Sequence, residues 1–326
     1  MIITQTPLRI PIGGGGTDIP SYYKRERGHW ISAAINKYIY ITLNNTMSDE
    51  FIIRYSQIER TAKIDEIKHP LIREIFKLIK ARPGLEMSSI ADIPSGTGMG
   101  SSGSFGVGLI RALQAHNRNH YDPSEVAEMA CHVEMNILKE PSGKQDQYAA
   151  TYGGITEYEC DKDGKVTARP LALSPSTLID LEENLLLFFT GYTRKAGDIL
   201  KKQDDATKAN DNDMIENLNK TKALGLEIKD ALVSGNCVHF GELMDTHWQN
   251  KKKRGKMSNP DIDKWYNLAL ANGAVGGKVI GAGGGGFLMF YAKDRHTLRQ
   301  AMQKEGLHEI RFGFDFEGSR VLLNLG

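Results

Sequence analysis

The chain has 326 residues, which predicts about two domains, and its 41 Lys and Arg residues nearly balance its 40 Asp and Glu residues, leaving a net charge of +1. This balance argues against a nucleic-acid binder that relies on bulk positive charge. We find no signal-peptide pattern and no apolar run long enough to span a membrane, so we expect a cytoplasmic protein with no membrane partner. The three cysteines are scattered, and neither a CxxC nor an HExxH motif is present. We therefore expect no disulfide framework and no dedicated metal cage.

The first predicted element is a strand from Thr4 to Ile12, and it runs into the first of three glycine clusters. Glycine is in surplus, with 34 residues, of which four lie at 13–16, six at 96–108 and five at 281–286. Because glycine lacks a Cβ, such clusters allow backbone to approach a ligand closely. The first cluster ends at Asp18, which could cap a helix or hold a sugar hydroxyl, and Arg9 lies upstream in the same strand-turn unit.

Mixed strands and helices are predicted next. Residues 30–43 indicate one or two strands, and residues 51–55 indicate another. The segment 70–80 has apolar residues at helical spacing and predicts an amphipathic helix. The segment 105–115, which follows the second glycine cluster, predicts a further helix in the same way.

The second glycine cluster has the sequence PSGTGMGSSGS at 94–104, directly before the predicted helix. A helix N-terminus offers free N–H groups and a positive dipole end, which together favour phosphate. The hydroxyls of Ser101 and Ser102 could reach a phosphate or a Mg²⁺ ion. The Walker A pattern is absent, and the acidic residue that a dinucleotide-binding fold places near position 120 is missing. We therefore predict a phosphate-binding loop of another type.

The best-defined helix begins after Asp122, where Pro123 and Glu125 complete a capping-box pattern. Its predicted buried stripe is Val126, Met129, Ala130, Val133 and Ile137. Glu134 falls beside this stripe, so we expect a partly shielded carboxylate.

A polar segment follows at 140–148. It could be an ordinary loop, but its Lys-x-Asp pair near a phosphate loop suits activation of a hydroxyl group. Asp146 would take the proton, and either Lys144 or Arg9 would keep Asp146 ionised.

The polar stretch after Cys160 predicts a domain boundary near 175–183, dividing the chain into residues 1–178 and 179–326. The second part alternates a buried strand (184–189), charged helices across 195–250, a helix at 261–272, a strand at 277–280, a strand at 287–292, a helix at 294–305 and two short terminal strands. This pattern indicates an α+β domain.

The third glycine cluster, KVIGAGGGGF at 278–287, lies between two predicted strands. It matches GxGxxG, but a strand follows it and only about 40 residues remain, which excludes a dinucleotide fold. A hairpin turn and a loop that closes over a ligand both remain possible readings.

The three glycine segments, taken in order, resemble the three motifs of the GHMP family of small-molecule kinases, and the resemblance covers nearly the whole chain. Within this family the chain is most similar to kinases of D-glycero-D-manno-heptose 7-phosphate and to the kinase part of L-fucokinases, on the basis of GGGGTD at 13–18 and GKQDQ at 143–147. The resemblance implies a two-domain α+β fold, with an N-terminal half like domain 2 of ribosomal protein S5 and a ferredoxin-like C-terminal half.

The resemblance also implies roles for individual residues. The ATP phosphates would be held by Pro94, Gly96, Gly98, Met99, Gly100, Ser101, Ser102 and Gly103. Mg²⁺ would be served by Ser102 and Glu134, and the transfer step by Asp146, Arg9 and Lys144. The sugar would be held by Gly15, Gly16, Thr17, Asp18, Gly283, Gly284, Gly285 and Arg194.

The function implied by the resemblance is that of an ATP-dependent sugar 1-kinase acting on heptose 7-phosphate to give the 1,7-bisphosphate. Alternatives are another acceptor, such as L-fucose or galactose, and a non-catalytic sugar sensor. The expected partners are a small sugar or sugar phosphate, with no nucleic acid; the oligomeric state stays open. A 7-phosphate needs cationic partners, and the candidates are Arg25, Arg27, Lys37, Arg194 and the run 251–256. We retain Arg194 among these, because it follows a predicted strand end.

Overall fold

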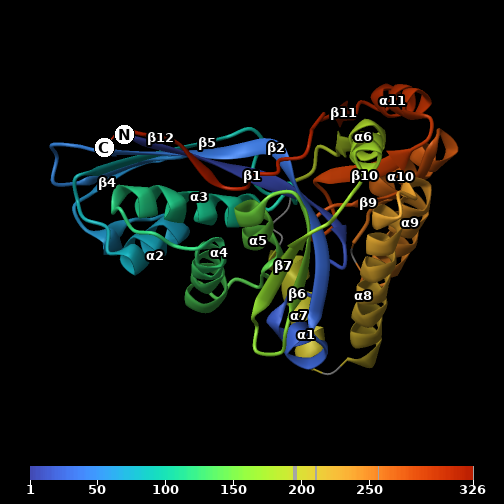
Figure 1. The fold of residues 1–326 in the computed structure, drawn as a ribbon, viewed down its shortest axis with the longest axis horizontal. Helices are drawn as coiled ribbons and strands as arrows, with labels where there is room; N and C mark the ends of the chain where they lie inside the picture. Colours follow the sequence, from blue (N-terminus) through green and yellow to red (C-terminus); the bar gives the residue numbers. More distant parts are fainter. Residues whose placement is uncertain (194–196, 210, 256, 326) are drawn as a thin grey trace.

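The computed structural model describes residues 1–193, 197–209, 211–255 and 257–325, and it contains two β-sheets with helices packed against them (Figure 1). The strands of the first sheet are β1 (Ile2–Gly13), β2 (Gly28–Asn45), β3 (Phe51–Arg54), β4 (Ile58–Thr61), β5 (Leu85–Ala91), β6 (Ile155–Cys160), β7 (Val166–Pro170) and β12 (Arg320–Asn324). Their order is β12-β1-β2-β5-β3-β4, with β6 and β7 branching from β2. The segment 30–43 is thus part of a single strand, which pairs with β5 through one half and with β6 through the other.

The helices of the first half are α1 (Pro20–Glu26), α2 (Pro70–Ile79), α3 (Ser101–His116), α4 (Pro123–Cys131) and α5 (Gln145–Tyr152). Helices α2, α3 and α4 lie on one side of the first sheet (Figure 1). Helix α3 packs directly on β1 and β2, and α5 packs beside α3. This arrangement brings the N-terminal ends of α3 and α5 close to the middle of β1.

The second sheet has the order β11-β8-β10-β9. Its strands are β8 (Leu185–Phe189), β9 (Ala274–Val279), β10 (Phe287–Ala292) and β11 (His308–Glu309). The helices around it are α6 (Pro175–Asn184), α7 (Gly197–Lys208), α8 (Asn212–Val233), α9 (Cys237–Lys252), α10 (Pro260–Ala271) and α11 (Arg295–Lys304). These bounds lie close to the predicted strands and helices, except that α6 falls where we expected the polar boundary.

The two halves share one core. Strand β8 is a continuous apolar run because both of its faces are buried. Leu187 on one face belongs to the large buried cluster that includes Leu8 and Phe287, whereas Phe188 on the other face joins a smaller cluster around Trp248. The last strand, β12, returns to pair with β1, so both chain ends lie side by side (Figure 1). The boundary at 178/179 stays a prediction, and the final strand lies with the first sheet.

The helix predicted after Asp122 begins as expected, with its capping box in place: the Asp122 N–H donates to Glu125 Oε2 at 2.7 Å. The regular helix ends at Cys131, and the residues His132–Ile137 form a π-helical segment instead. The wider turn changes which side chains face inward. Ile137, predicted to be buried, is 38% exposed, whereas Glu134 is buried. Such π-helical turns are frequent at functional sites.

The structure has no helix, among those in the described ranges, that is long and apolar enough to cross a membrane. The three cysteines, Cys131, Cys160 and Cys237, are all buried with free thiols.

Candidate active site

A large cavity of about 1080 Å³ lies where the three glycine-rich segments meet. Its wall includes Gly15 and Gly16 from the first segment, Gly96, Gly98 and Gly100 from the second, and Gly281, Gly283 and Gly285 from the third. The glycine surplus therefore has a common location, at the junction of the two halves of the chain.

The second segment leads into the N-terminus of α3. Gly100 precedes the first helical residue with φ +77°, a backbone conformation that glycine adopts at little cost. The first N–H groups of a helix have no partner within the helix. The Ser101 hydroxyl is also buried without a hydrogen-bond partner in the described part of the chain. The residues at this end of the cavity thus offer unsatisfied donors that fit a phosphate group.

The third segment supports this loop from behind. A Cβ atom at Gly281 would lie 2.5 Å from the Cα atom of Gly98, so the two loops touch through their backbones. The Lys251 ammonium donates to the Gly281 carbonyl at 2.5 Å. Because β9 and β10 pair on either side of this segment, it is a hairpin turn as well as part of the cavity wall. The hairpin-turn reading is therefore confirmed, and closure of this loop over a ligand stays a prediction.

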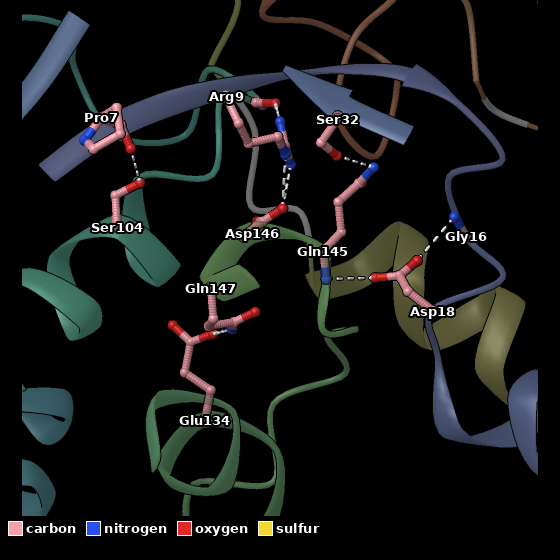
Figure 2. Close-up of polar contacts among 12 residues, drawn as sticks. Pro7, Arg9, Gly16, Asp18, Ser32, Ser104, Glu134, Gln145, Asp146 and Gln147 are labelled. Atoms are coloured by element: carbon pink, nitrogen blue, oxygen red, sulfur yellow. Dashed lines mark hydrogen bonds and ion pairs between the residues drawn. The ribbon is translucent and has the colours of Figure 1, made fainter. Parts of the chain in front are cut away.

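Arg9 and Asp146 both line the cavity, and their side chains point toward each other (Figure 2). The Arg9 Nε and Nη2 atoms donate to Asp146 Oδ1 at 2.8 and 2.5 Å, and Nη1 donates to the Gly98 carbonyl at 2.6 Å. Asp146 lies in the first turn of α5, and a Cβ atom at Gly103 would lie 2.7 Å from its Cβ atom. The Asp146 side chain keeps 33% of its surface exposed. It is therefore paired with Arg9 while remaining accessible from the cavity.

Lys144 is turned away from this pair. Its ammonium donates to Glu128 Oε1 at 2.6 Å and to the Gly164 carbonyl at 2.5 Å, and it lies over the Tyr23 ring. Of the two cations that the sequence offered to Asp146, only Arg9 contacts it. The predicted contribution of Lys144 at the transfer step is corrected accordingly: Lys144 fixes the segment before α5 and does not line the cavity.

Asp18 joins the first glycine segment to α5. Its Oδ1 atom accepts from the Gly16 N–H at 3.0 Å, and its Oδ2 atom accepts from the Gln145 N–H at 3.1 Å (Figure 2). Burial raises the pKa of Asp18, and the nearby Asp146 charge adds to this effect. Helix α1 begins after Ile19 without a side-chain cap, so Asp18 is not a helix cap. Its carboxylate instead faces the cavity beside Gly16.

Glu134 lies between α3 and α5. The Ser102 hydroxyl donates to one of its carboxylate oxygens, and the Gln147 amide donates to the other. Burial raises the pKa of Glu134 to about 7, against the opposing effect of these two hydrogen bonds. No group of three or more His, Cys, Asp or Glu side chains within the described ranges could hold a metal by itself. One carboxylate and one hydroxyl nevertheless fit Mg²⁺, which commonly takes few protein oxygens together with substrate phosphates.

Several predicted residues do not face the cavity. The Thr17 hydroxyl lies 2.9 Å from the Gly14 carbonyl and 2.7 Å from the His29 carbonyl, and it accepts from the His29 N–H, so it holds the loop in shape. Met99 is completely buried, and its carbonyl accepts from the Arg9 N–H. Gly284 donates its N–H to the Met257 carbonyl. These three residues, like Gly103 behind Asp146, shape the wall, and the direct contact with substrate predicted for Thr17 is corrected.

Cations that the sequence interpretation had set aside line the cavity instead. The basic run after Trp248 divides: Lys251 and Arg254 face the cavity, whereas Lys253 is exposed. Lys278 lines it as well. Arg194, which we had retained, lies outside the described residues. The sequence did contain a signal for these residues, because the spacing of positions 247, 251 and 254 would place them on one face of a helix.

The sequence also did not reveal the apolar end of the cavity. Beside Pro94 the wall is formed by Ile39, Tyr55, His69, Ile90 and Phe105, which come from separate strands and helices. No local pattern links these residues, and only the packing of α2 and α3 against the sheet brings them together.

Comparisons with known proteins agree with this geometry. Residues 67–154 match the family described as "GHMP kinases N terminal domain", and residues 228–306 match "GHMP kinases C terminal". The chain is 31% identical to the D-glycero-alpha-D-manno-heptose 7-phosphate kinase of Campylobacter jejuni, over 97% of each chain. It is 24% identical to the L-fucokinase/L-fucose-1-P guanylyltransferase of Bacteroides fragilis, of which it spans about a third.

Solved structures have the same fold. A D-glycero-D-manno-heptose 1-phosphate kinase from Bacteroides thetaiotaomicron superposes with a TM-score of 0.82 at 24% identity, covering all of both chains. A putative sugar kinase from Campylobacter jejuni gives a TM-score of 0.77 at 29% identity, covering 98% of this chain and 97% of that one. The expected two-domain fold is thus confirmed.

Proposed function

Since the chain belongs to the GHMP kinase family and is an ATP-dependent phosphotransferase acting on a sugar hydroxyl, we propose that its acceptor is D-glycero-D-manno-heptose 7-phosphate and its product the 1,7-bisphosphate. The support for this acceptor is the 31% identity to a heptose 7-phosphate kinase over 97% of both chains. A cytoplasmic location is part of the proposal, because three free cysteines suit a reducing compartment.

In the proposed reaction, the sugar hydroxyl attacks the γ-phosphorus of ATP. A new oxygen–phosphorus bond forms, the bond to the β,γ-bridging oxygen breaks, and the hydroxyl proton passes to Asp146. The Arg9 guanidinium, at 2.5 Å from Asp146 Oδ1, would orient this carboxylate and offset charge on the phosphoryl group. The observation that carries the proposal is this pair at the N-terminus of α3, since phosphoryl transfer depends mainly on positioning and electrostatics.

The remaining residues would position the two substrates. The N–H groups at the start of α3 would bind the ATP phosphates, and the apolar end of the cavity beside Tyr55 and Phe105 would receive the adenine ring of ATP. Asp18 would accept hydrogen bonds from sugar hydroxyls. Ser102 and Glu134 would hold Mg²⁺, which when bound neutralises phosphate charge.

A coupled ATP-turnover assay against heptose 7-phosphate, the unphosphorylated heptose, L-fucose and galactose tests the proposal. We expect the highest kcat/KM with heptose 7-phosphate. Faster turnover of L-fucose or galactose would identify the alternative acceptor. Binding of sugar with no ATP turnover on any acceptor would indicate the sensor function.

A further inference from the structure

The end of the cavity beside Gly16 carries three cationic side chains that form no ion pair with the described residues. Lys251, Arg254 and Lys278 all line this part of the wall. None of the three has a carboxylate within ion-pair distance in the described part of the chain. This is unusual, because a buried charge without a partner is costly to the folded state.

Neutral groups hold each cation in place. The Arg254 guanidinium donates to Asn217, Gln203 and Thr221 at 2.7, 3.1 and 2.5 Å. Lys251 and Lys278 each donate to one backbone carbonyl, those of Gly281 and Ile12. The cations are therefore oriented by neutral groups, and Asp18, the carboxylate whose charge acts on Arg254, forms no ion pair with it.

A histidine adds a second, independent indication of a ligand. His247 is only 4% exposed and lines the same cavity, one helical turn before Lys251. Neither of its ring nitrogens has a hydrogen-bond partner among the described residues. Buried polar atoms are normally paired, so two unpaired ring nitrogens beside a cavity indicate that a polar ligand completes the site.

We propose that His247, Lys251, Arg254 and Lys278 form an anion site for the phosphate ester of the acceptor sugar. A phosphate monoester carries about −1.5 to −2 charge at pH 7, which offsets several cations at once, whereas a neutral sugar offsets none. The planar fork of Arg254 suits phosphate oxygens. This inference rests on the proposed function, since it requires a phosphorylated acceptor.

The position of Arg254 separates this site from the ATP phosphates. A Cβ atom at Gly16 would lie 2.9 Å from Arg254 Nη1, which puts the guanidinium beside the first glycine segment. The hydrogen-bond partners of Arg254 lie on α7 and α8, and none lies on the phosphate loop at 94–102. An acceptor with its hydroxyl at Asp146 could therefore extend its distal phosphate toward Arg254.

The test compares R254Q with K253Q, a neighbouring exposed lysine of the same basic run. We expect R254Q to raise the KM for heptose 7-phosphate about 10- to 100-fold, the size of a lost charge-assisted hydrogen bond. Its KM for ATP and its kcat/KM for the unphosphorylated heptose should stay within about twofold of wild type. K253Q should match wild type throughout. An equal rise for both heptoses, or a rise in the KM for ATP, would overturn the proposal.

Equilibrium binding of heptose 7-phosphate without nucleotide separates this inference from the proposed function. If wild type binds the sugar phosphate tightly and R254Q does not, the anion site stands even where turnover fails. If wild type turns over heptose 7-phosphate but R254Q and K251Q bind it normally, the function stands and the anion site is wrong. Absence of binding to wild type overturns both. Should R254Q not fold, R254K is measured instead, because it keeps the charge but loses the planar fork, and its melting temperature checks that it is folded.

Discussion

The two ends of the cavity treat charge in opposite ways. At the end formed by α3 and α5, Arg9 pairs with Asp146, and the buried Glu134 accepts hydrogen bonds from Ser102 and Gln147. At the other end, Lys251, Arg254 and Lys278 have only neutral partners within the described residues. At the first end the charged side chains have partners without a ligand and only neutral donors, such as the Ser101 hydroxyl, stay unpaired, whereas at the second end the cations form no ion pair.

This difference indicates different tasks. Groups that perform chemistry need fixed geometry and a defined protonation state before substrate arrives, and internal ion pairs provide both. Groups that select a substrate gain discrimination when they remain unsatisfied until the right ligand binds, since any other ligand leaves them unpaired. Substitutions at the two ends should therefore change different kinetic constants.

The largest effect is expected at the paired end, from D146N. Asparagine keeps the shape of Asp146 but cannot accept the hydroxyl proton, so kcat should fall by about 10³-fold, within the range for a lost general base. The carboxamide oxygen can still accept from Arg9, and ATP binding measured by calorimetry should be unchanged. Turnover within tenfold of wild type would show that Asp146 is not the base.

The next effect concerns the contact between the two glycine loops. In G281A the new methyl group would overlap the backbone of Gly98, and Gly281 itself has φ +70°, a conformation that alanine rarely adopts. The resulting shift of the phosphate loop should lower kcat/KM about 100-fold, because catalysis is sensitive to displacements near 1 Å.

The matched control for G281A is G306A. Gly306 has φ +79°, and a Cβ atom added there would meet no other atom within 4 Å, so this variant tests backbone strain alone. Both variants should lose comparable thermal stability from the left-handed backbone, but only G281A should lose activity. Equal activity in the two variants would mean that the contact with Gly98 does not position the loop.

A third prediction concerns Glu134. In E134Q the side chain keeps its shape but loses its charge, so the Mg²⁺ concentration for half-maximal activity should rise at least roughly 10-fold. Because burial holds the pKa of Glu134 near 7, the carboxylate is costly to ionise in the free protein at pH 8. The melting temperature without Mg²⁺ should therefore not fall. An unchanged Mg²⁺ requirement would remove Glu134 from the metal site.

Local sequence patterns predicted most of the fold but not all of it. The capping box at Asp122 and the apolar stripe of α2 are determined by residues a few positions apart, and both appear as expected. Helix α5 was missed because its first turn is polar and Lys144 provides no side-chain cap. Its position depends on packing against α3, which is remote in sequence.

The site shows the same division between local and remote information. The motifs indicated Arg9, Asp146 and Glu134, and the fold brings them to adjoining positions (Figure 2). The direction of the Lys144 side chain could not be read from the motif, because its partner Glu128 lies on α4. The importance of Lys251 and Arg254 was hidden within a run of basic residues until the end of α9 and the turn after it placed these two at the cavity.

The smallest predicted effect, a pH dependence, belongs to the unpaired end. Burial and the Arg9 charge lower the pKa of Lys278 to about 7, from an ordinary value of 10.5. Lys278 therefore loses its proton in the free protein as pH rises from 7 to 9, whereas a phosphate monoester, with a second pKa of about 6, keeps its charge over the same interval. Among the groups that face it, Arg254 has a pKa lowered only to about 10, and His247, whose pKa lies well below 6.5, is neutral throughout. Burial and the neighbouring cations also lower the pKa of Lys251 well below its usual value, so K251Q is measured beside wild type to assign the linked proton to Lys278.

Binding of an anion favours the protonated lysine, so binding takes up a proton and weakens as pH rises. We expect the Kd for heptose 7-phosphate, measured without nucleotide, to rise several-fold between pH 7 and 9. If one proton is linked to binding, the Kd can rise by at most about tenfold per pH unit. The unphosphorylated heptose is the control, and its Kd should stay constant. The effect of pH on the folding stability of the free protein is opposite to its effect on binding. Between pH 7 and 10.5 the unfolded chain binds more protons than the folded chain, so the stability that buried Lys278 costs becomes smaller as pH rises through this interval. A Kd that rises equally for both sugars would assign the pH dependence to the paired end of the cavity and would remove Lys278 from the anion site.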